Sequence, residues 1–222
     1  MTPASTSLTA RTRWTIAIAY VACWVAGLLV GGPQVDPGAT ADELAQAFAD
    51  ETRVLVFAVL VHGVAAVLLV LLGLALGSGP TRRLAVALAA TAAVLSFGQL
   101  AGEVSLVTGP RLAEASATWE SVSRVDGLKM LVLAALVAAV WVGATHTGRV
   151  LTVVSGLAVV TLLLSGAGYV TVSPGLMTLA GASLPLLLVW SLVATATSVR
   201  ERSPEPGPVA RTDGDGAVAA ST

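Results

Sequence analysis

Long apolar segments alternate with shorter polar ones along the whole chain, and this alternation is the strongest pattern in the sequence. Six of the apolar segments have about 18 residues or more, enough at a helical rise of about 1.5 Å per residue to cross the roughly 30 Å of hydrocarbon in a bilayer. The pattern predicts an all-α fold, a polytopic membrane bundle of six transmembrane helices. The predicted spans are residues 14–31, 54–76, 84–107, 128–145, 150–172 and 176–199.

The polar segments between the spans indicate which helices lie side by side. Residues 77–83, 146–149 and 173–175 are short, so the spans that each one joins should pack as antiparallel neighbours. Residues 32–53 and 108–127 are long and acidic. We expect these two connectors to lie at the same end of the bundle.

The first long connector carries the pattern of a short amphipathic helix. Thr40, with Glu43 three residues later, predicts an N-terminal capping box. Leu44, Ala47 and Phe48 then fall on one face of the predicted helix. We predict that both long connectors cover one end of the bundle, with ligand-gating lids as the alternative. The second connector repeats the pattern more weakly, with Leu112, Ala115 and Trp119 at helical spacing.

The distribution of Lys and Arg near the span ends predicts the orientation of the bundle. One side carries more of these residues than the other, so we place both termini of this multi-pass protein in the cytoplasm. The residues on the predicted cytoplasmic side are Arg11, Arg13, Arg82, Arg83, Arg149, Arg200 and Arg202, and those on the other side are Arg53, Arg111, Arg124 and Lys129.

The composition supports a membrane protein and narrows its partners. Hydrophobic residues make up 55% of the 222 residues and charged residues 11%, far from the average of soluble domains. A net charge of −1 leaves no basic patch for nucleic acid, so the lipid bilayer is the predicted partner. Cys23 is the only cysteine, so no intrachain disulfide can form. We expect residues 1–202 to form the bundle and residues 203–222, rich in Pro, Gly, Ser and acid, to be a disordered cytoplasmic tail.

A few polar side chains interrupt the apolar spans, and they form the candidate site. Ser96, Gln99 and Glu103 lie at i, i+3 and i+7 of the third span, so they share one helix face. Counted by helix rise from the span ends, His62 of the second span reaches the depth of Gln99, and Lys129 of the fourth span reaches the depth of Glu103. We call His62, Gln99, Glu103 and Lys129 the polar cluster and predict that it lies inside the outer half of the bundle.

The high cost of unpaired charge in hydrocarbon predicts how the polar cluster is arranged. We predict an ion pair between Glu103 and Lys129 and a hydrogen bond between a neutral His62 and Gln99. The cluster could fix the register of the helices, form a proton or solute pathway that opens outward, or bind a cofactor or lipid. Two residues of the fifth span at a similar depth could join it, Ser165 and Tyr169.

No motif in the sequence supports an enzyme, a metal site or a bound cofactor. HExxH, P-loop and GxSxG patterns are all absent. His62 and His146 are the only histidines, and their predicted depths, mid-membrane and cytoplasmic edge, are too different for them to bind one haem iron. Asp50 and Glu51 lie outside the membrane and should be solvated. We therefore expect no catalytic residue, no metal and no cofactor.

Glycine and proline within the spans bear on helix packing. Three GxxxG pairs occur there, a spacing that lets helix backbones approach closely, and we expect them to serve packing within the chain. Pro185 is expected to kink the sixth span or to mark a break in it. The glycine pairs are Gly27 and Gly31, Gly73 and Gly77, and Gly98 and Gly102.

The layout resembles that of a known class of membrane protein. A basic N-terminus precedes a span that ends in "GGPQVDPGATADELAQAFADE", and "VFAVLVHGVAAVLLVLLGLAL", "GRVLTVVSGLAVVTLLLSGAGYV" and "ASLPLLLVWSLVATAT" follow. These segments resemble uncharacterised six-helix integral membrane proteins of high-GC Gram-positive bacteria, grouped as a domain of unknown function. The resemblance covers nearly the whole chain up to about Arg202. It implies a plasma-membrane location and a helical bundle, and it implies no activity or functional residue.

Two functional hypotheses remain. The first is a structural or accessory membrane protein without enzymatic activity, in which the polar cluster holds the bundle together. The alternative is a small transporter or proton-coupled permease that uses the same residues. The connectors differ between the two halves of the chain, which weighs against the inverted repeats of many transporters. A solvent-filled cavity that reaches His62 would favour the transporter.

Overall fold

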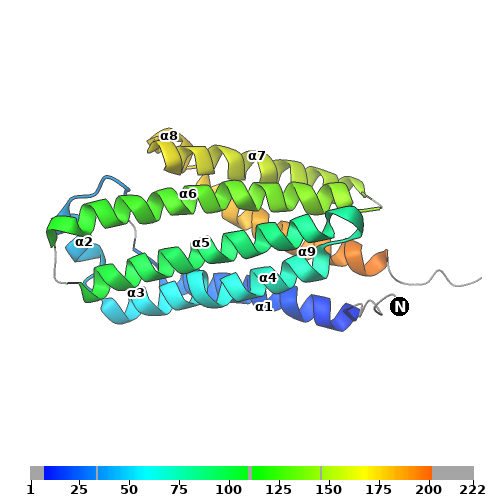
Figure 1. The fold of residues 1–222 in the computed structure, drawn as a ribbon, viewed down its shortest axis with the longest axis horizontal. Helices are drawn as coiled ribbons and strands as arrows, with labels where there is room; N and C mark the ends of the chain where they lie inside the picture. The colour runs from blue at the N-terminus through cyan, green and yellow to red at the C-terminus, as the bar shows by residue number, and fades with distance from the viewer. Residues whose placement is uncertain (1–7, 34, 110–111, 146, 202–222) are drawn as a thin grey trace, which may run out of the picture.

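The protein is a bundle of helices that run roughly along one axis (Figure 1). The computed structural model describes residues 8–33, 35–109, 112–145 and 147–201, and these contain no strand. Within them, six helices are long and apolar enough to cross a membrane. The predicted all-α fold with six candidate spans is confirmed. His146 and the tail predicted at residues 203–222 lie outside the described residues.

The candidate spans are continuous helices, except that the second changes helix type along its length and the sixth is interrupted. In chain order the elements are α1 (Ala10–Val30), α2 (Ala41–Ala47), α3 (Glu51–Ala58), η1 (Val59–Val64), α4 (Ala65–Leu76), η2 (Gly79–Thr81), α5 (Arg82–Thr108), α6 (Leu112–Gly143), α7 (Arg149–Thr171), α8 (Pro174–Met177) and α9 (Ala180–Arg200).

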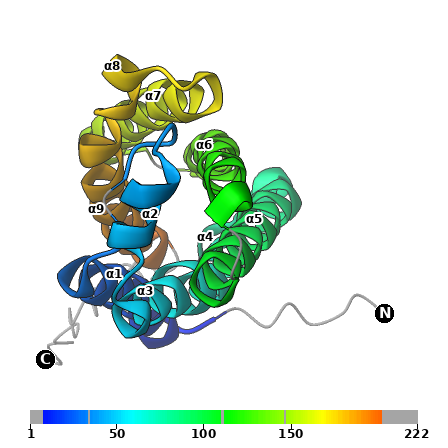
Figure 2. The ribbon, with the colours of Figure 1, turned by 90° about the vertical axis from the view of Figure 1, so that its left-hand side faces the viewer.

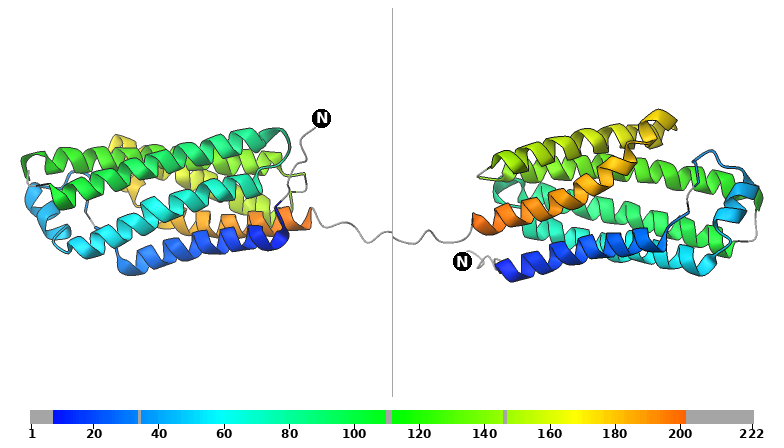
Figure 3. Two further views of the ribbon diagram at one scale, coloured as in Figure 1. Left: turned by 60° about the horizontal axis from the view of Figure 1, so that its bottom comes forward. Right: turned by 180° about the vertical axis from the view of Figure 1, so that it is seen from behind.

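The six spans form a ring when the bundle is viewed along its axis (Figure 2). Helices α1, α4, α5, α6, α7 and α9 follow one another around the ring, and α9 packs back against α1. The short connections join helices that lie side by side, as predicted. Helix α2 lies across one end of the ring, and the first residues of α1 and the last of α9 lie at the other (Figures 1 and 3). We call these the α2 end and the terminal end.

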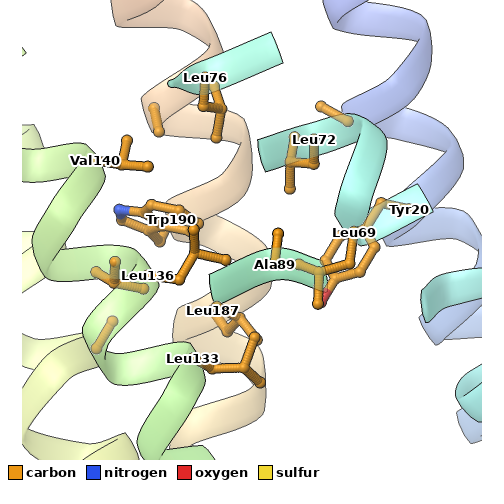
Figure 4. Packing of buried hydrophobic residues seen from close by; sticks show 14 of the residues in the cluster. Tyr20, Leu69, Leu72, Leu76, Ala89, Leu133, Leu136, Val140, Leu187 and Trp190 are labelled. Atoms are coloured by element: carbon orange, nitrogen blue, oxygen red, sulfur yellow. The ribbon is translucent and has the colours of Figure 1, made fainter. Parts of the chain in front are cut away.

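The half of the ring near the terminal end is filled with apolar side chains (Figure 4). Leu72 of α4, Leu136 of α6, and Leu187 and Trp190 of α9 are almost fully buried there. Many Leu and Val side chains on the outside of the ring are exposed instead, which is typical of a surface that lipid covers. The larger apolar cluster therefore lies in the terminal half.

Helix α2 is held in place by its cap and by an apolar cluster. The Thr40 side chain accepts a hydrogen bond from the Glu43 N–H, and the Glu43 carboxylate accepts one from the Thr40 N–H at 2.8 Å, so the predicted capping box is confirmed. The bonds from the Thr40 N–H and hydroxyl lower the pKa of Glu43. Leu44 and Phe48 pack near Trp119 of α6, and the rings of Phe48 and Trp119 meet edge to face at 5.6 Å.

Helix α6 is longer than the sequence pattern predicts. It runs for 32 residues without a break, so most of the connector predicted at 108–127 is helical. Charged residues in that segment lower its hydropathy, and the prediction therefore placed it outside the bundle. In the structure the helical turns put Trp119, Val122 and Lys129 on the inward side, where they are buried. Asp126, which falls within the connector predicted at 108–127, consequently lies in the wall of the bundle.

The sixth span is interrupted before Pro185. Helices α8 and α9 are separated by a turn at Thr178, and Pro185 lies within α9. Helix α7 ends at Val172, which has a φ of 53°, a left-handed conformation that is unusual for a β-branched residue. This conformation lets the Ser173 N–H donate to the Gly168 carbonyl at 2.8 Å and closes the end of α7.

Glycines make several of the close contacts between helices. A Cβ added at Gly27, Gly73 or Gly102 would come within 2.7 Å of a side chain on a neighbouring helix, so one member of each GxxxG pair packs within the chain. A second contact lies outside these pairs, where Gly127 of α6 meets Gly166 of α7. A Cβ at Gly127 would lie 2.7 Å from the Gly166 carbonyl oxygen, so α6 and α7 approach backbone to backbone.

Candidate functional site

The α2 half of the bundle contains a cavity of about 640 Å³. Side chains from α1, η1, α5, α6, α7 and α9 form its wall. All four residues of the polar cluster line it, together with Asp126. We call this cavity the polar pocket.

The connector that carries α2 borders the polar pocket. Asp36 lines the pocket and also a hollow of about 760 Å³ between α2 and α8. The Trp119 indole N–H donates to the Asp36 carbonyl at 3.0 Å, and the Ser116 hydroxyl donates to the Ala39 carbonyl at 3.0 Å. These bonds fix the connector to α6 beside the pocket.

His62 and Glu103 lie next to each other in the wall of the polar pocket. The Nε2 atom of His62 lies 3.4 Å from Oε1 of Glu103, and the two side chains are only 7% and 3% exposed. Within the described residues, the remaining polar atoms, His62 Nδ1 and Glu103 Oε2, have no hydrogen-bond partner. Buried polar atoms without a partner are rare and costly, and they point to water or a ligand at that position.

A π-helix presents His62 to the pocket. The six residues of η1 form i→i+5 turns within an otherwise α-helical span. A run of π-helix is rare, and such segments occur often at functional sites. The extra residue per turn rotates the side chains that follow, and it leaves the Leu60 carbonyl to accept from both the Ala65 N–H and the Cys23 thiol, the latter at 3.1 Å. Contacts from α1 thereby support the π-helix directly behind His62.

Lys129, Asp126 and Gln99 form a second, fully connected group. The Lys129 ammonium lies 2.7 Å from Oδ1 of Asp126 and donates to Oε1 of Gln99 at 2.5 Å. The Gln99 amide N–H in turn donates to the same Asp126 oxygen at 2.9 Å. The ammonium therefore has two polar partners, one charged and one neutral, and Gln99 bridges α5 to α6.

The structure brings the residues of the polar cluster together, but both predicted contacts, the Glu103–Lys129 ion pair and the His62–Gln99 hydrogen bond, are wrong. Glu103 faces His62 rather than Lys129, and Gln99 bonds to Lys129 and Asp126 rather than to His62. Asp126 lies one helical turn before Lys129 on α6, so it reaches the ammonium more easily than a carboxylate on another helix. Its spacing from Lys129, i to i+3, is the pattern in the sequence that could have identified it.

The fifth span contributes one of its two predicted residues to the pocket. Tyr169 lines the polar pocket, whereas Ser165 lies beside it. The Ser165 hydroxyl is 3.4 Å from the hydroxyl of Ser183, which does line the pocket. Ser165 also donates to the Thr161 carbonyl at 2.8 Å, so its hydrogen-bonding needs are met within α7.

The polar groups of the pocket can bind a charged ligand or a proton. The part of the chain that the structure describes holds no group of three or more His, Cys, Asp and Glu side chains that could bind a metal ion. An imidazole beside a carboxylate can share a proton with it. The unpaired atoms of that pair can also accept a ligand.

Comparisons with protein-family models, with curated proteins and with solved structures found no match. The family resemblance drawn from the sequence stays a prediction. The polar pocket is thus the basis for the function proposed below.

Proposed function

We propose that this membrane protein is a small carrier that binds an organic solute in the polar pocket and exchanges it for a proton. The observation that carries the proposal is the cavity of about 640 Å³ that reaches His62 and Glu103. Its volume lies within the range of pockets that hold small organic molecules. Burying an ionisable pair inside a membrane bundle costs free energy, and such pairs are typical of proton pathways.

We also propose how the protein is oriented and in which membrane it lies. The distribution of Lys and Arg favours an extracytoplasmic α2 end. The resemblance described above favours a bacterial plasma membrane. The apolar core of the terminal half would then separate the pocket from the cytoplasm. Pro185 and the break between α8 and α9 lie near the α2 end of the sixth span, beside the pocket, where the helix could move to change access to it. No enzymatic step is part of the proposal.

A purely structural role is the second candidate. It is favoured by the Lys129, Asp126 and Gln99 group, whose hydrogen bonds tie α5 to α6 without any ligand. That role accounts for three of the polar side chains. It does not account for the unpaired atoms of His62 and Glu103.

Solute-driven proton movement tests the proposal. The purified protein, in vesicles that contain a pH-sensitive dye, is challenged with small organic cations, anions, zwitterions and neutral solutes. We expect at least one class to move protons across the bilayer, and we expect Glu103→Gln to abolish the movement because the exchanging carboxylate is lost.

Glu120→Gln is the matched control for this assay. Glu120 lies on α6, at the same end of the bundle as Glu103 on α5, but its side chain is 43% exposed and pairs with Arg124 on the surface. The control variant should move protons like the wild type. Absence of movement with every class, or equal movement by Glu103→Gln and the wild type, would contradict the carrier.

A further inference from the structure

We infer that the solute of the polar pocket is an organic monocation with an apolar body, and that it displaces a proton from the His62 and Glu103 pair. This inference rests on the carrier function proposed above and names its substrate class. It follows from the charge, the unpaired atoms and the aromatic lining of the pocket.

The charges that line the polar pocket favour a cation. Asp36, Glu103 and Asp126 contribute three carboxylates, and Lys129 contributes one ammonium. The lining is therefore negative whether or not His62 carries a proton. Lys129 is already bound to Asp126 and Gln99, so its charge is directed away from a ligand. The carboxylate that remains for a ligand is Glu103, whose Oε2 atom has no partner within the described residues.

Aromatic rings supply the second part of the recognition. Trp24, Phe57, Trp119 and Tyr169 all line the pocket, from four different parts of the chain. The faces of aromatic rings attract organic cations, Trp most strongly, and such contacts gain strength where water is excluded. Apolar side chains of α1, α6, α7 and α9 complete the wall, including Leu28, which suits a ligand that carries hydrocarbon next to its charge.

Competition with a proton follows from the surroundings of His62. The groups that face it are Glu103 on α5, Asp126 and Lys129 on α6, Tyr169 on α7, and Asp36 on the connector. On α1, which packs against η1, the titratable groups at this level are Tyr20 and Cys23. A cation bound beside Glu103 neutralises the carboxylate and repels a proton held between His62 and Glu103, so it weakens the binding of that proton. Binding of the cation should release one proton to the water at the α2 end.

Calorimetric titration of the full-length protein with benzyltrimethylammonium tests this inference. The probe has a fixed positive charge, an apolar ring and no proton of its own to exchange. Phenylmethanesulfonate, which has a similar size and the opposite charge, is the matched control ligand. Titrations in buffers of different ionisation enthalpy report how many protons are released.

We expect the cation to bind with release of about one proton and the anion not to bind. Towards acid pH the affinity should fall by up to about tenfold per pH unit, as linkage to one proton requires. Glu103→Gln should weaken binding by about tenfold or more, and Glu120→Gln should leave it unchanged. The pH dependence and the comparison of the two ligands use wild-type protein, so they remain informative if Glu103→Gln does not fold.

The outcomes separate this inference from the carrier function. Equal binding of cation and anion, or no binding of the cation, overturns the substrate class. If an anion or a zwitterion moves protons in the vesicle assay while the cation does not bind, the carrier stands and the inference falls. If the cation binds and releases a proton but no solute moves protons across the bilayer, the inference stands and the carrier falls.

Discussion

Replacing Lys129 by Met should lower the free energy of unfolding by about 3 kcal/mol, because it leaves the Asp126 carboxylate in the bundle without its cation. The Lys129 side chain is 5% exposed and that of Asp126 23%, so water can compensate the lost ammonium only in part. The loss of the hydrogen bond to Gln99 adds to the effect. Denaturant titration of the purified protein in mixed micelles measures the change.

The double variant identifies the partner of Lys129. Combining Lys129→Met with Asp126→Asn should restore most of the lost stability, since the uncompensated charge is gone. Combining Lys129→Met with Glu103→Gln should not, because Glu103 faces His62. Rescue by the Glu103 substitution instead of the Asp126 substitution would contradict the observed pairing.

Gly127→Ala should have the second large effect, a loss of about 2 kcal/mol from overpacking between α6 and α7. Its Cβ would lie 2.7 Å from the Gly166 carbonyl oxygen and 2.8 Å from the Cβ of Tyr169. Backbone atoms cannot rotate away as a flexible side chain can, so the two helices would have to separate. The same denaturant titration measures the loss.

Gly156→Ala on α7 is the control for this prediction. A Cβ there would meet nothing within 4 Å, so the better helix propensity of alanine should leave the stability equal or raise it by up to about 1 kcal/mol. Similar losses from both variants would mean that alanine is unfavourable at glycine positions in these helices generally, and would contradict a specific effect of the Gly127 contact.

The spans were predictable because their apolar runs are long and the connections at residues 77–83 and 173–175 are short. The capping box of α2 was predictable because Thr40 and Glu43 define it locally. The start of α6 was not predictable. A helix that faces a polar pocket can carry charge on one side, and hydropathy averaged around the helix does not show this. The π-helix at His62 was not predictable either, because it depends on packing against α1 and on no residue pattern of its own.

The sequence was sufficient to predict which residues form the polar cluster, but not which of them contact each other. Gln99 and Glu103 could be placed on one face of the third span, and His62 and Lys129 at matching depth, by helix geometry alone. Which partner each charge takes depends on the rotation of one helix about its axis relative to the next. That rotation is fixed by contacts such as Gly102 against Val122, which a single sequence does not reveal.

A carrier requires water to reach the polar pocket, and thiol labelling measures this access. In a Cys23→Ser background, which keeps a donor for the Leu60 carbonyl, Ser183→Cys introduces a thiol into the pocket wall and Ser155→Cys introduces one into the apolar core of α7. Both serines are buried, so the two variants are matched in chemistry. Ala45→Cys on exposed α2 reports which face of the membrane the α2 end occupies.

A membrane-impermeant thiol reagent is applied to intact cells and to everted vesicles. We expect Ser183→Cys to react from the same side as Ala45→Cys and much faster than Ser155→Cys. Protection of Ser183→Cys to the same extent as Ser155→Cys, with Ala45→Cys fully labelled, would mean that the pocket is dry, and it would contradict a solute site at His62 and Glu103.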